Sequence, residues 1–468
     1  MKISAIIFLS LMTTPLIGQG LLFDDDRYNQ LPRQSQYNDG GKSEEKALEG
    51  WTQKSLKEYC PRIQNQGEVA SCVGWSVGYS AFSIQQAILN GWAGQKDNIT
   101  ANAFSAMFIF NQIKITHCKN GSFIDSAMTL LQRTGDLYAN EFDEDKVNCS
   151  RQPTSSELDR ASTHKIMDFK TLFEPRDPKR IKINKTKLSL VQNRPVIIGM
   201  KLPASFQKVR KGAKTWFPRP NEPAYMGHAM TVIGFDDSRG AFEIMNSWSK
   251  DWGNDGFIWV KYDHFAKFVS YAFQMSLNEK LKKEKRYTAS LGFRRFVALQ
   301  SNGEPLFNDG EKVTWNGRYY QLKKDDWQTG KIFQLLVSQV TANTYLHVFS
   351  IDPTNEVNVH WPRKGESSEV TDPVVTLFVP GEDGGLQLNK IGKEHICILY
   401  SKVPILDFEE KIASLKDVEG DILDRLYTVF GDKMLSLDKI QFDARKMKFR
   451  NKMEEAEILP LVLQITVR

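Results

Sequence analysis

The hydrophobic pattern between residues 51 and 275 changes from a helical period to a strand period along the chain. Three early stretches have the spacing of buried helix faces, and they are Cys72–Leu89, Asn102–Lys114 and Ile124–Gly135. Four later stretches are short apolar runs of the kind found in strands, and they are Pro195–Met200, His228–Asp236, Ala241–Asn246 and Gly256–Tyr262. Helices followed by strands predict an α+β domain over residues 51–277.

A second pattern, richer in strands, occupies residues 289–468 and predicts a separate β-rich domain. Residues Lys331–Asp352 read as two strands around a polar turn. Further strands are expected at Asp372–Gly381, His395–Lys402 and Glu457–Val467, and a helical stretch is expected near Leu406–Phe430. The charge-dense stretch Asn278–Arg286 has no large apolar face. Residues 278–288 are therefore predicted to be a linker, with a solvated helix as the alternative.

The first twenty residues have the composition of a secretory signal peptide. Lys2 precedes an apolar stretch over residues 3–17, and the small residues Gly18 and Gly20 follow as candidate cleavage positions. The apolar stretch is interrupted by Pro15 and is shorter than the ~20 residues that a spanning helix needs. No later segment is apolar enough to span a membrane either. We expect residues 1–20 to be removed and the mature protein to be secreted or periplasmic, without stable membrane insertion.

Residues 21–50 are polar and rich in turn-forming residues, with few apolar side chains. Such a composition buries too little apolar surface to offset the entropy that ordering the chain would cost. We expect a flexible leader here, with no core of its own.

Composition narrows the classes of function. The chain has 468 residues, of which 25% are charged and 41% are hydrophobic, as in globular proteins with two or three domains. The 62 basic and 56 acidic residues give a net charge of +6, which is small for this length. Because no basic stripe with interleaved aromatic residues occurs, we expect no nucleic-acid partner.

The number of cysteines is odd. They are Cys60, Cys72, Cys118, Cys149 and Cys397. In an oxidising compartment most cysteines pair, so at least one should stay free or pair between chains. Cys397 lies in an apolar strand and is expected to be a buried free thiol.

Cys72 has the setting of a nucleophile. It begins a predicted helix, where unpaired backbone N–H groups favour an anion and lower the pKa of a thiol. Ser71 is expected to cap this helix. Gly67 allows a sharp turn that directs the amide of Gln66 back towards the cysteine. Free cysteines are usually small buried hydrophobes, and this structural role is the alternative for Cys72.

His228 is the best candidate for a base, because it opens an apolar strand that fixes its ring. Asn246 ends the next strand, and a hairpin would set the two side chains side by side, with the amide oxygen holding the imidazole. The indole of Trp248 would shield that hydrogen bond from water. A core histidine satisfied by a backbone carbonyl is the alternative.

The three stretches "NQGEVASCVGWS", "GHAMTVIGFDD" and "NSWSKDWGNDGFIWV" resemble, in the same order, the three catalytic blocks of papain-like cysteine peptidases. His228 and Asn246 follow Cys72 at slightly more than the ~130 to 150 residues typical of this family. The resemblance implies that Cys72 is the nucleophile and His228 the base and then the acid. It also implies that Asn246 orients His228, and that Gln66 and the Cys72 backbone N–H bind the oxyanion.

The resemblance covers roughly residues 55–273 and implies a two-lobed fold, with a helical lobe and an antiparallel β lobe. "CKNGS" resembles the family block that lines the substrate cleft, so Gly121 and Ser122 are candidate substrate-binding residues together with Trp248. The C-terminal half resembles an accessory domain of unassigned function attached to bacterial papain-like peptidases. We expect no counterpart of the family's folded inhibitory pro-domain, because residues 21–50 are too few and too polar. Either the peptidase is not regulated by a propeptide, or control comes from its second domain, a partner or delivery.

The sequence departs from the family around the nucleophile. Val69 replaces a cysteine, and Val73 replaces a tryptophan. The usual partner of Cys118 is thereby lost, and pairing with Cys149 is favoured over pairing with Cys60 or two unpaired thiols.

We therefore expect a secreted or periplasmic cysteine endopeptidase that acts on peptides or proteins through an acyl-enzyme. The histidines of the second half lack metal-ligand spacing, so neither a metal nor a cofactor is expected. An envelope component or a protein is the expected partner of the C-terminal domain. The competing hypothesis is an inactive papain-like module that binds peptides while the C-terminal domain carries the function, and amide-bond chemistry on cell-wall peptides is a third.

Overall fold

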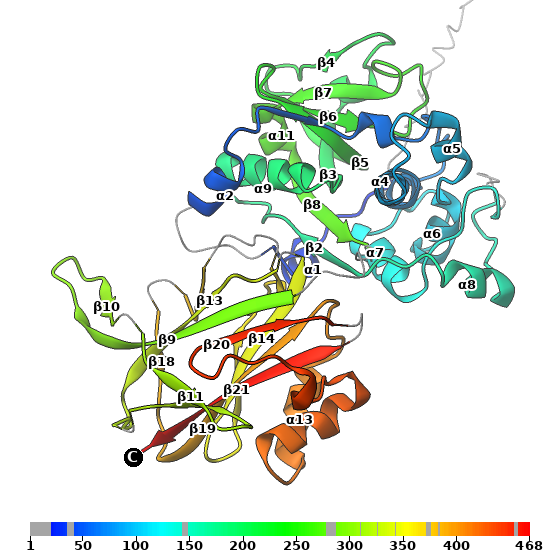
Figure 1. Cartoon of the computed structure of the whole chain (residues 1–468). Helices are drawn as coiled ribbons and strands as arrows, with labels where there is room; N and C mark the ends of the chain where they lie inside the picture. The colour runs from blue at the N-terminus through cyan, green and yellow to red at the C-terminus, as the bar shows by residue number, and fades with distance from the viewer. Residues whose placement is uncertain are drawn as a thin grey trace, which may run out of the picture. The chain divides into compact units, whose positions relative to one another are not determined.

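The computed structural model describes the chain from residue 20 to residue 468, apart from residues 35–41, 143–147, 278–286, 309, 325, 342, 371–375, 382–383 and 454–456. It divides into two compact units (Figure 1). The first unit comprises Met1–Tyr28, Trp51–Ile166 and Glu174–Met275, and the second comprises Asn29–Gly50, Met167–Phe173 and Ser276–Arg468. Most of the predicted signal peptide and of the predicted linker lies outside the described residues.

The helices of the first unit include η2, all of whose residues are buried. The helices and their bounds are η1 (Lys57–Tyr59), α3 (Cys72–Gly74), η2 (Trp75–Phe82), α4 (Ser83–Leu89), α5 (Lys96–Ala101), α6 (Ala106–Ile113), α7 (Ile124–Arg133), α8 (Ser155–Ala161), α9 (Lys179–Val191), α10 (Ala204–Gln207) and α11 (Tyr262–Phe268). The consecutive helices α3, η2 and α4 confirm the predicted helix over residues 72–89. Helix α6 packs against α3 and η2, where Ala106 approaches Gly74 and the Ile109 side chain approaches Gly78, and Phe82 stacks on Phe104 with ring centroids 3.8 Å apart. This helical lobe holds Cys72 at the start of a rigid element.

The β lobe of the first unit is one mainly antiparallel sheet. Its strands are β1 (Gln53–Ser55), β3 (Val196–Pro203), β4 (Thr215–Trp216), β5 (Ala224–Asp236), β6 (Ala241–Met245), β7 (Phe257–Lys261) and β8 (Val269–Ser276). They follow the order β8-β3-β5-β6-β7-β4, with β1 paired to β5. The predicted hairpin is confirmed, because β5 and β6 pair antiparallel from Asp236 opposite Ala241. The α+β, two-lobed fold predicted for this part of the chain is thus confirmed.

The expectation that residues 21–50 lack packed apolar side chains is wrong for their first part. Leu21 is 6% exposed and Tyr28 is 3% exposed. The helix α1 (Asp25–Asn29) places Tyr28 on Tyr271, with the rings stacked 4.1 Å apart. Two well-placed apolar residues anchor this segment although its composition is polar.

The second unit is built on two sheets, which confirms the β-rich accessory domain. The 6-stranded sheet has the order β10-β9-β13-β17, with β18 on β13 and β20 on β9, and the 7-stranded sheet has the order β11-β12-β21-β19-β14-β15, with β16 on β14. Their bounds are β9 (Tyr287–Leu299), β10 (Pro305–Phe307), β11 (Val313–Trp315), β12 (Tyr320–Leu322), β13 (Ile332–Ser338), β14 (Thr344–Ile351), β15 (Val357–Trp361), β16 (Glu369–Val370), β17 (Leu377–Val379), β18 (Leu386–Gln387), β19 (Gly392–Ser401), β20 (Met447–Asn451) and β21 (Ile458–Val467). The second unit also contains α2 (Lys42–Ala47), β2 (Asp168–Thr171), α12 (Phe408–Ser414), η3 (Leu415–Asp417), α13 (Ile422–Phe430), η4 (Gly431–Lys433) and η5 (Leu437–Lys439).

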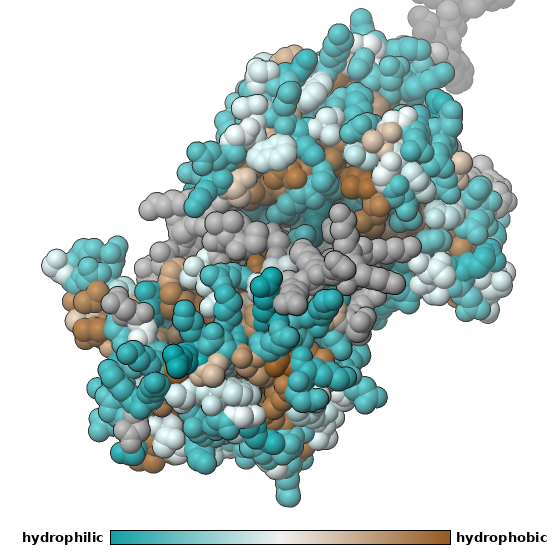
Figure 2. Space-filling view, in the orientation of Figure 1, coloured by the Kyte–Doolittle hydropathy of each residue, from teal (hydrophilic) through white to brown (hydrophobic). Residues whose placement is uncertain are grey.

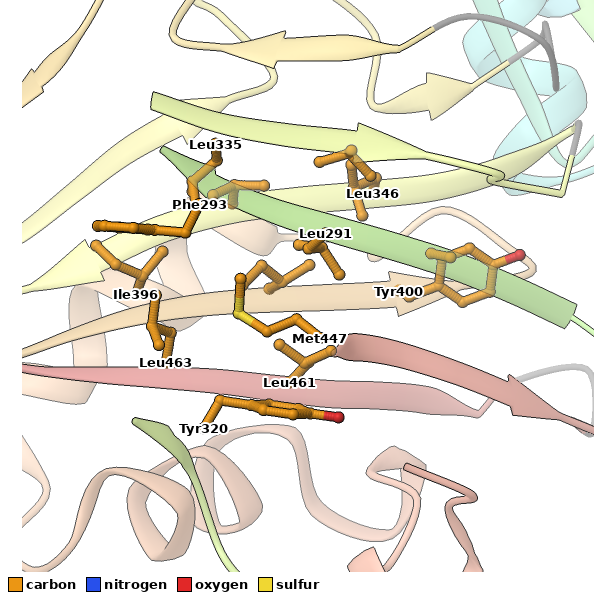
Figure 3. Close-up of a cluster of buried hydrophobic side chains, with 14 of the residues drawn as sticks. Leu291, Phe293, Tyr320, Leu335, Leu346, Ile396, Tyr400, Met447, Leu461 and Leu463 are labelled. Carbon is orange, nitrogen blue, oxygen red and sulfur yellow. The ribbon is translucent and has the colours of Figure 1, made fainter. Parts of the chain in front are cut away.

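Strand β19 explains why this part of the sequence has an uninterrupted apolar run. Ile396, Ile398 and Tyr400 point into the core between the two sheets, part of which is shown in Figure 3. Cys397 and Leu399 point to the other face, where the apolar sides of α12 and α13 cover them. Because successive side chains of a strand alternate between faces, a strand buried on both faces is apolar throughout.

Hydrophilic side chains predominate on the face of the molecule drawn in Figure 2, where hydrophobic residues form small separate patches. Across the part of the chain that the structure describes, no helix combines the length and the apolar character that crossing a membrane requires.

Candidate active site

Cys72 is the first residue of α3 and is completely buried. Ser71 occupies the N-cap position, but its side chain makes no capping hydrogen bond, so the predicted cap is wrong. The reason is its backbone, with φ −98° and ψ 16°, whereas a capping residue adopts extended angles that aim its oxygen at the helix.

The predicted lowering of the Cys72 pKa is also wrong for this state of the chain. Burial raises the pKa of the Cys72 thiol to about 12, although the backbone N–H groups of Ala229 and Gly20 act in the opposite direction. Desolvation of the thiolate outweighs the helix terminus here. The thiol lies close to strand β5, because the backbone N–H of Ala229 contacts it. Ala229 directly follows His228 in the chain.

His228 and Asn246 are brought together by the hairpin of β5 and β6. The two atoms His228 Nε2 and Asn246 Oδ1 are 2.8 Å apart, and both side chains are buried. The backbone N–H of Ser247 donates to the same oxygen at 2.8 Å. This second donor identifies the atom as the amide oxygen, so His228 donates from Nε2. A neutral imidazole in this tautomer accepts protons at Nδ1.

The ring of Trp248 covers the pair. It stacks on His228 with centroids 4.4 Å apart and an interplanar angle of 25°. Trp248 is 7% exposed and packs edge-on against Trp252, whose indole N–H donates to the carbonyl of Phe206 at 3.1 Å. The shielding of the hydrogen bond matches the sequence prediction. The supporting contacts of Phe206 and of Trp252 were not predicted, although Trp252 lies within the third of the quoted stretches.

Gln66 is completely buried beside these residues. Its Nε2 donates to the carbonyl of Val69 at 3.0 Å, and its Oε1 accepts from the hydroxyl of Ser247 at 2.7 Å. Gly67 has φ +63°, which provides the predicted sharp turn. The amide is therefore held at both ends, and its second N–H hydrogen is not used by the bond to Val69. The part played by Ser247 was not predicted, because a serine after an asparagine has no signature of its own.

The disulfide that was favoured from the sequence is confirmed. Cys118 and Cys149 are joined, while Cys60, Cys72 and Cys397 are buried free thiols. The backbone N–H of Ala70 donates to the carbonyl of Cys118 at 2.8 Å, which ties the disulfide to the loop before Cys72. Val69, at the position where the family has a cysteine, packs in the apolar cluster that contains Cys149.

Ser122 lies on the helical lobe with its backbone engaged in a short parallel bridge to Leu21. Its N–H donates to the carbonyl of Gly20 at 2.8 Å, and its carbonyl accepts from Leu22 N–H at 3.1 Å. Gly121 has φ +69°, and a side chain there would collide with the Gly20 carbonyl. These two residues thus lie against the backbone of residues 20–22.

Comparisons with known proteins cover the part of the chain that contains all of these residues. The family model described as papain family cysteine protease matches residues 50–277. An uncharacterized peptidase C1-like protein of Acanthamoeba polyphaga mimivirus is 30% identical over 87 residues, which are 18% of this chain and only 28% of that protein. The chain thus matches less than a third of this curated relative's length.

Two solved structures are similar to the chain. Xylellain, a cysteine protease from Xylella fastidiosa, has a TM-score of 0.45 and 17% identity over 56% of this chain and 96% of its own. Digestive procathepsin L 3 of the Tenebrio molitor larval midgut has a TM-score of 0.40 and 14% identity over 53% of this chain and 77% of its own. The family match spans the whole candidate site, and residues 50–277 of this chain belong to the papain family of cysteine proteases.

Proposed function

We propose that this protein is a cysteine endopeptidase whose catalytic residues are Cys72, His228, Asn246 and Gln66. The observation that carries the proposal is the hydrogen bond of 2.8 Å between His228 and Asn246, under the ring of Trp248 and on the strand next to the Cys72 thiol. A buried hydrogen bond of this kind keeps Nε2 of the imidazole protonated as the donor. The other nitrogen, Nδ1, is then free of hydrogen and can accept a proton.

In the proposed reaction His228 takes the proton of Cys72, and the thiolate attacks a peptide carbonyl. The oxyanion that forms receives hydrogen bonds from the Cys72 backbone N–H and from the second N–H of the Gln66 amide. His228 then protonates the leaving amine, and an acyl-enzyme remains. Water activated by His228 hydrolyses the thioester and regenerates the thiol.

The substrate is proposed to lie extended between the lobes. The backbone of Gly121 and Ser122 would pair with it, as that of Ser122 already does with residues 20–22. Trp248 would border the bound peptide. Secretion or export to a periplasm is proposed as well, since the Cys118–Cys149 disulfide persists in oxidising compartments.

The test compares Cys72→Ser with Cys60→Ser, which removes another buried free thiol of the same unit. Hydrolysis of an unfolded protein is followed by mass spectrometry, so that internal cleavage is distinguished from trimming of ends. We expect Cys72→Ser to abolish hydrolysis and Cys60→Ser to retain it. Full hydrolysis by Cys72→Ser would refute the assignment, and binding without cleavage by the unmodified chain would favour the inactive peptide-binding module.

A further inference from the structure

A cavity of about 280 Å³ lies within the second unit, where β14 ends and β19 begins. Both sheets contribute to its walls: Phe333 and Leu386 belong to the 6-stranded sheet, and Ser350, His360 and Glu394 belong to the 7-stranded sheet. Leu386 is on β18, which is labelled in Figure 1. Since a water molecule takes up about 30 Å³ of the liquid, the cavity has room for a small organic ligand.

Buried polar side chains form the floor of this cavity. Ser350 is 3% exposed and Glu394 is 7% exposed. The Ser350 hydroxyl is hydrogen-bonded to the Glu394 carboxyl, and its Oγ is 2.9 Å from His360 Nε2. An ionised carboxyl can only accept, so Ser350 donates to Glu394 and accepts from the N–H of His360.

The floor offers hydrogen-bond acceptors to a ligand. Among the residues that the structure describes, no hydrogen bond uses Nδ1 of His360, and the Ser350 hydroxyl donates only one hydrogen to the two oxygens of Glu394. Burial lowers the pKa of His360 to about 4 and raises that of Glu394 to about 7. At neutral pH the imidazole is therefore uncharged and its Nδ1 is free of hydrogen.

The arrangement differs from that of a catalytic triad. In a triad the acid binds the imidazole, and the imidazole binds the hydroxyl. Here the carboxyl of Glu394 binds the hydroxyl of Ser350 instead, and burial accounts for the shift of the His360 pKa without a carboxylate. These residues are arranged to hold a ligand and not to attack it.

Side chains at the mouth of the cavity add hydrogen-bond donors. Asn358 and Asn389 are exposed lining residues, and each carboxamide offers an NH2 donor beside its carbonyl acceptor. The ammonium group of Lys390 is 2.6 Å from Asp352 and 3.1 Å from Glu356. The charges at the mouth thus largely compensate one another.

These groups favour a neutral ligand that both donates and accepts hydrogen bonds. An anionic ligand would meet the carboxyls of Glu394 and Asp352. An ammonium group cannot accept, so it would leave the amide donors of the mouth unused. A sugar hydroxyl does both, and the apolar side chains of Phe333 and Leu386 provide a wall for the C–H groups of a sugar ring.

We propose that this cavity binds a neutral saccharide unit, either as a free sugar or within a longer glycan. Glu394 and His360 accept hydrogen bonds from its hydroxyl groups at the floor, and Asn358 and Asn389 bind it at the mouth. The cavity lies wholly within the second unit, so the proposal does not depend on Cys72 being a nucleophile.

The test measures binding of neutral sugars to the full chain by saturation-transfer difference NMR. The probes are the methyl glycosides of glucose, galactose, mannose and N-acetylglucosamine, and the amide of N-acetyl-lysine is the cationic comparison. We expect at least one glycoside to bind with a millimolar Kd, as for a ligand of about a dozen non-hydrogen atoms. Binding of none of the glycosides, or preference for the lysine derivative, would overturn the proposal.

Matched variants locate the bound sugar. Glu394→Leu removes the buried acceptor and should weaken binding at least tenfold, as for a hydrogen bond to a charged group worth about 1.5 to 3 kcal/mol. Glu410→Leu makes the same change at an exposed residue of α12 and should bind like the unmodified chain. Equal affinities in all three chains would place the sugar elsewhere and refute the site.

A third variant separates loss of the site from loss of the fold. Asn389→Ala changes only an exposed side chain at the mouth, so its circular dichroism spectrum should be unchanged, and binding should weaken about threefold or more. Unchanged affinity of this variant would contradict the proposed mode of binding. Retention of the chain on cellulose, agarose or chitin beads, in competition with the free glycoside, would identify a glycan as the source of the sugar.

The saccharide site and the proposed peptidase fail independently. Cys72→Ser should bind the glycoside like the unmodified chain, because Cys72 belongs to the first unit. Sugar binding without hydrolysis would leave the saccharide site standing and refute the peptidase. Hydrolysis that needs Cys72, in a chain that binds none of the glycosides, would leave the peptidase standing and refute the saccharide site.

Discussion

The hydroxyl of Ser247 donates a hydrogen bond of 2.7 Å to the side-chain oxygen of Gln66, although the two residues are 181 positions apart in the chain. The backbone of Gln66 is bound to the same residue, since its N–H donates to the Ser247 carbonyl at 2.8 Å. Ser247 directly follows Asn246, which accepts from His228. One short segment thus positions both the proposed base and the proposed oxyanion donor.

This relationship makes Ser247 a positioning residue with a measurable signature. Ser247→Ala should lower kcat about 5- to 10-fold with little change in KM, as expected for the loss of one hydrogen bond of ~1 kcal/mol. Gln66→Ala should lower kcat by about 10² to 10³, as for one oxyanion donor. The double variant should be no slower than Gln66→Ala alone, because Ser247 acts through Gln66. Losses that multiply would contradict that coupling.

The raised pKa of Cys72 predicts how its reactivity depends on pH. Because burial raises this pKa to about 12, the thiol of the covered site stays protonated at neutral and mildly alkaline pH. Only the thiolate reacts, so the alkylation rate of the unmodified chain should rise about tenfold per pH unit, with no plateau below roughly pH 10. Cys60, whose pKa is also raised to about 12 by burial, should show the same dependence on pH and serves as an internal comparison.

The disulfide predicts a link between stability and activity. Cys118 and Cys149 are 31 positions apart, and a loop of this length gives about 3 to 4 kcal/mol of stabilisation in the chain-entropy model. The variant with serine at both positions should therefore unfold at a lower urea concentration. Activity under folding conditions should fall too, since Cys118 supports the loop before Cys72 through Ala70. Unchanged urea unfolding would argue against a structural disulfide.

The second unit contains a buried ion pair that should be essential to its stability. Lys170 Nζ and Glu369 Oε2 are 2.6 Å apart, and the two side chains are 2% and 1% exposed. Glu369→Ala removes the carboxylate that pairs with the buried Lys170 ammonium and should cost about 3 to 5 kcal/mol. Thermal unfolding measures this loss. The control is Asp251→Ala, whose partner Lys211 is exposed, and it should leave the unfolding temperature unchanged.

The part of the site that could be predicted is the part that depends on the hydrophobic and polar pattern of neighbouring residues. An apolar strand, a turn and a second strand predict a hairpin, and a hairpin brings His228 to Asn246 wherever the rest of the chain lies. The long apolar stretch after Cys72 predicts a buried helix in the same way. Both follow from side-chain periodicity, which the sequence displays directly.

The packing of residues 21–28 could not be predicted in that way. The composition of this segment is polar, and its order depends on two apolar residues, Leu21 and Tyr28, that meet surfaces far along the chain at Gly227 and Tyr271. The pKa of Cys72 was misjudged for the same reason. A helix N-terminus is a local feature, whereas desolvation depends on everything that packs over the thiol.

The sequence alone determined the α+β and β-rich order of the two units and the hairpin of the proposed base, and it favoured Cys149 as the partner of Cys118 without excluding Cys60. The first two depend on the hydrophobic periodicity of the chain, and the third depends on the small number of cysteines available. Only the tertiary structure decided that Ser247 holds Gln66, that Ser71 does not cap its helix, and that Leu21 and Tyr28 are packed side chains. Those contacts join segments distant in the chain, and their energy comes from burial and complementary shape, which exist only after the chain has folded.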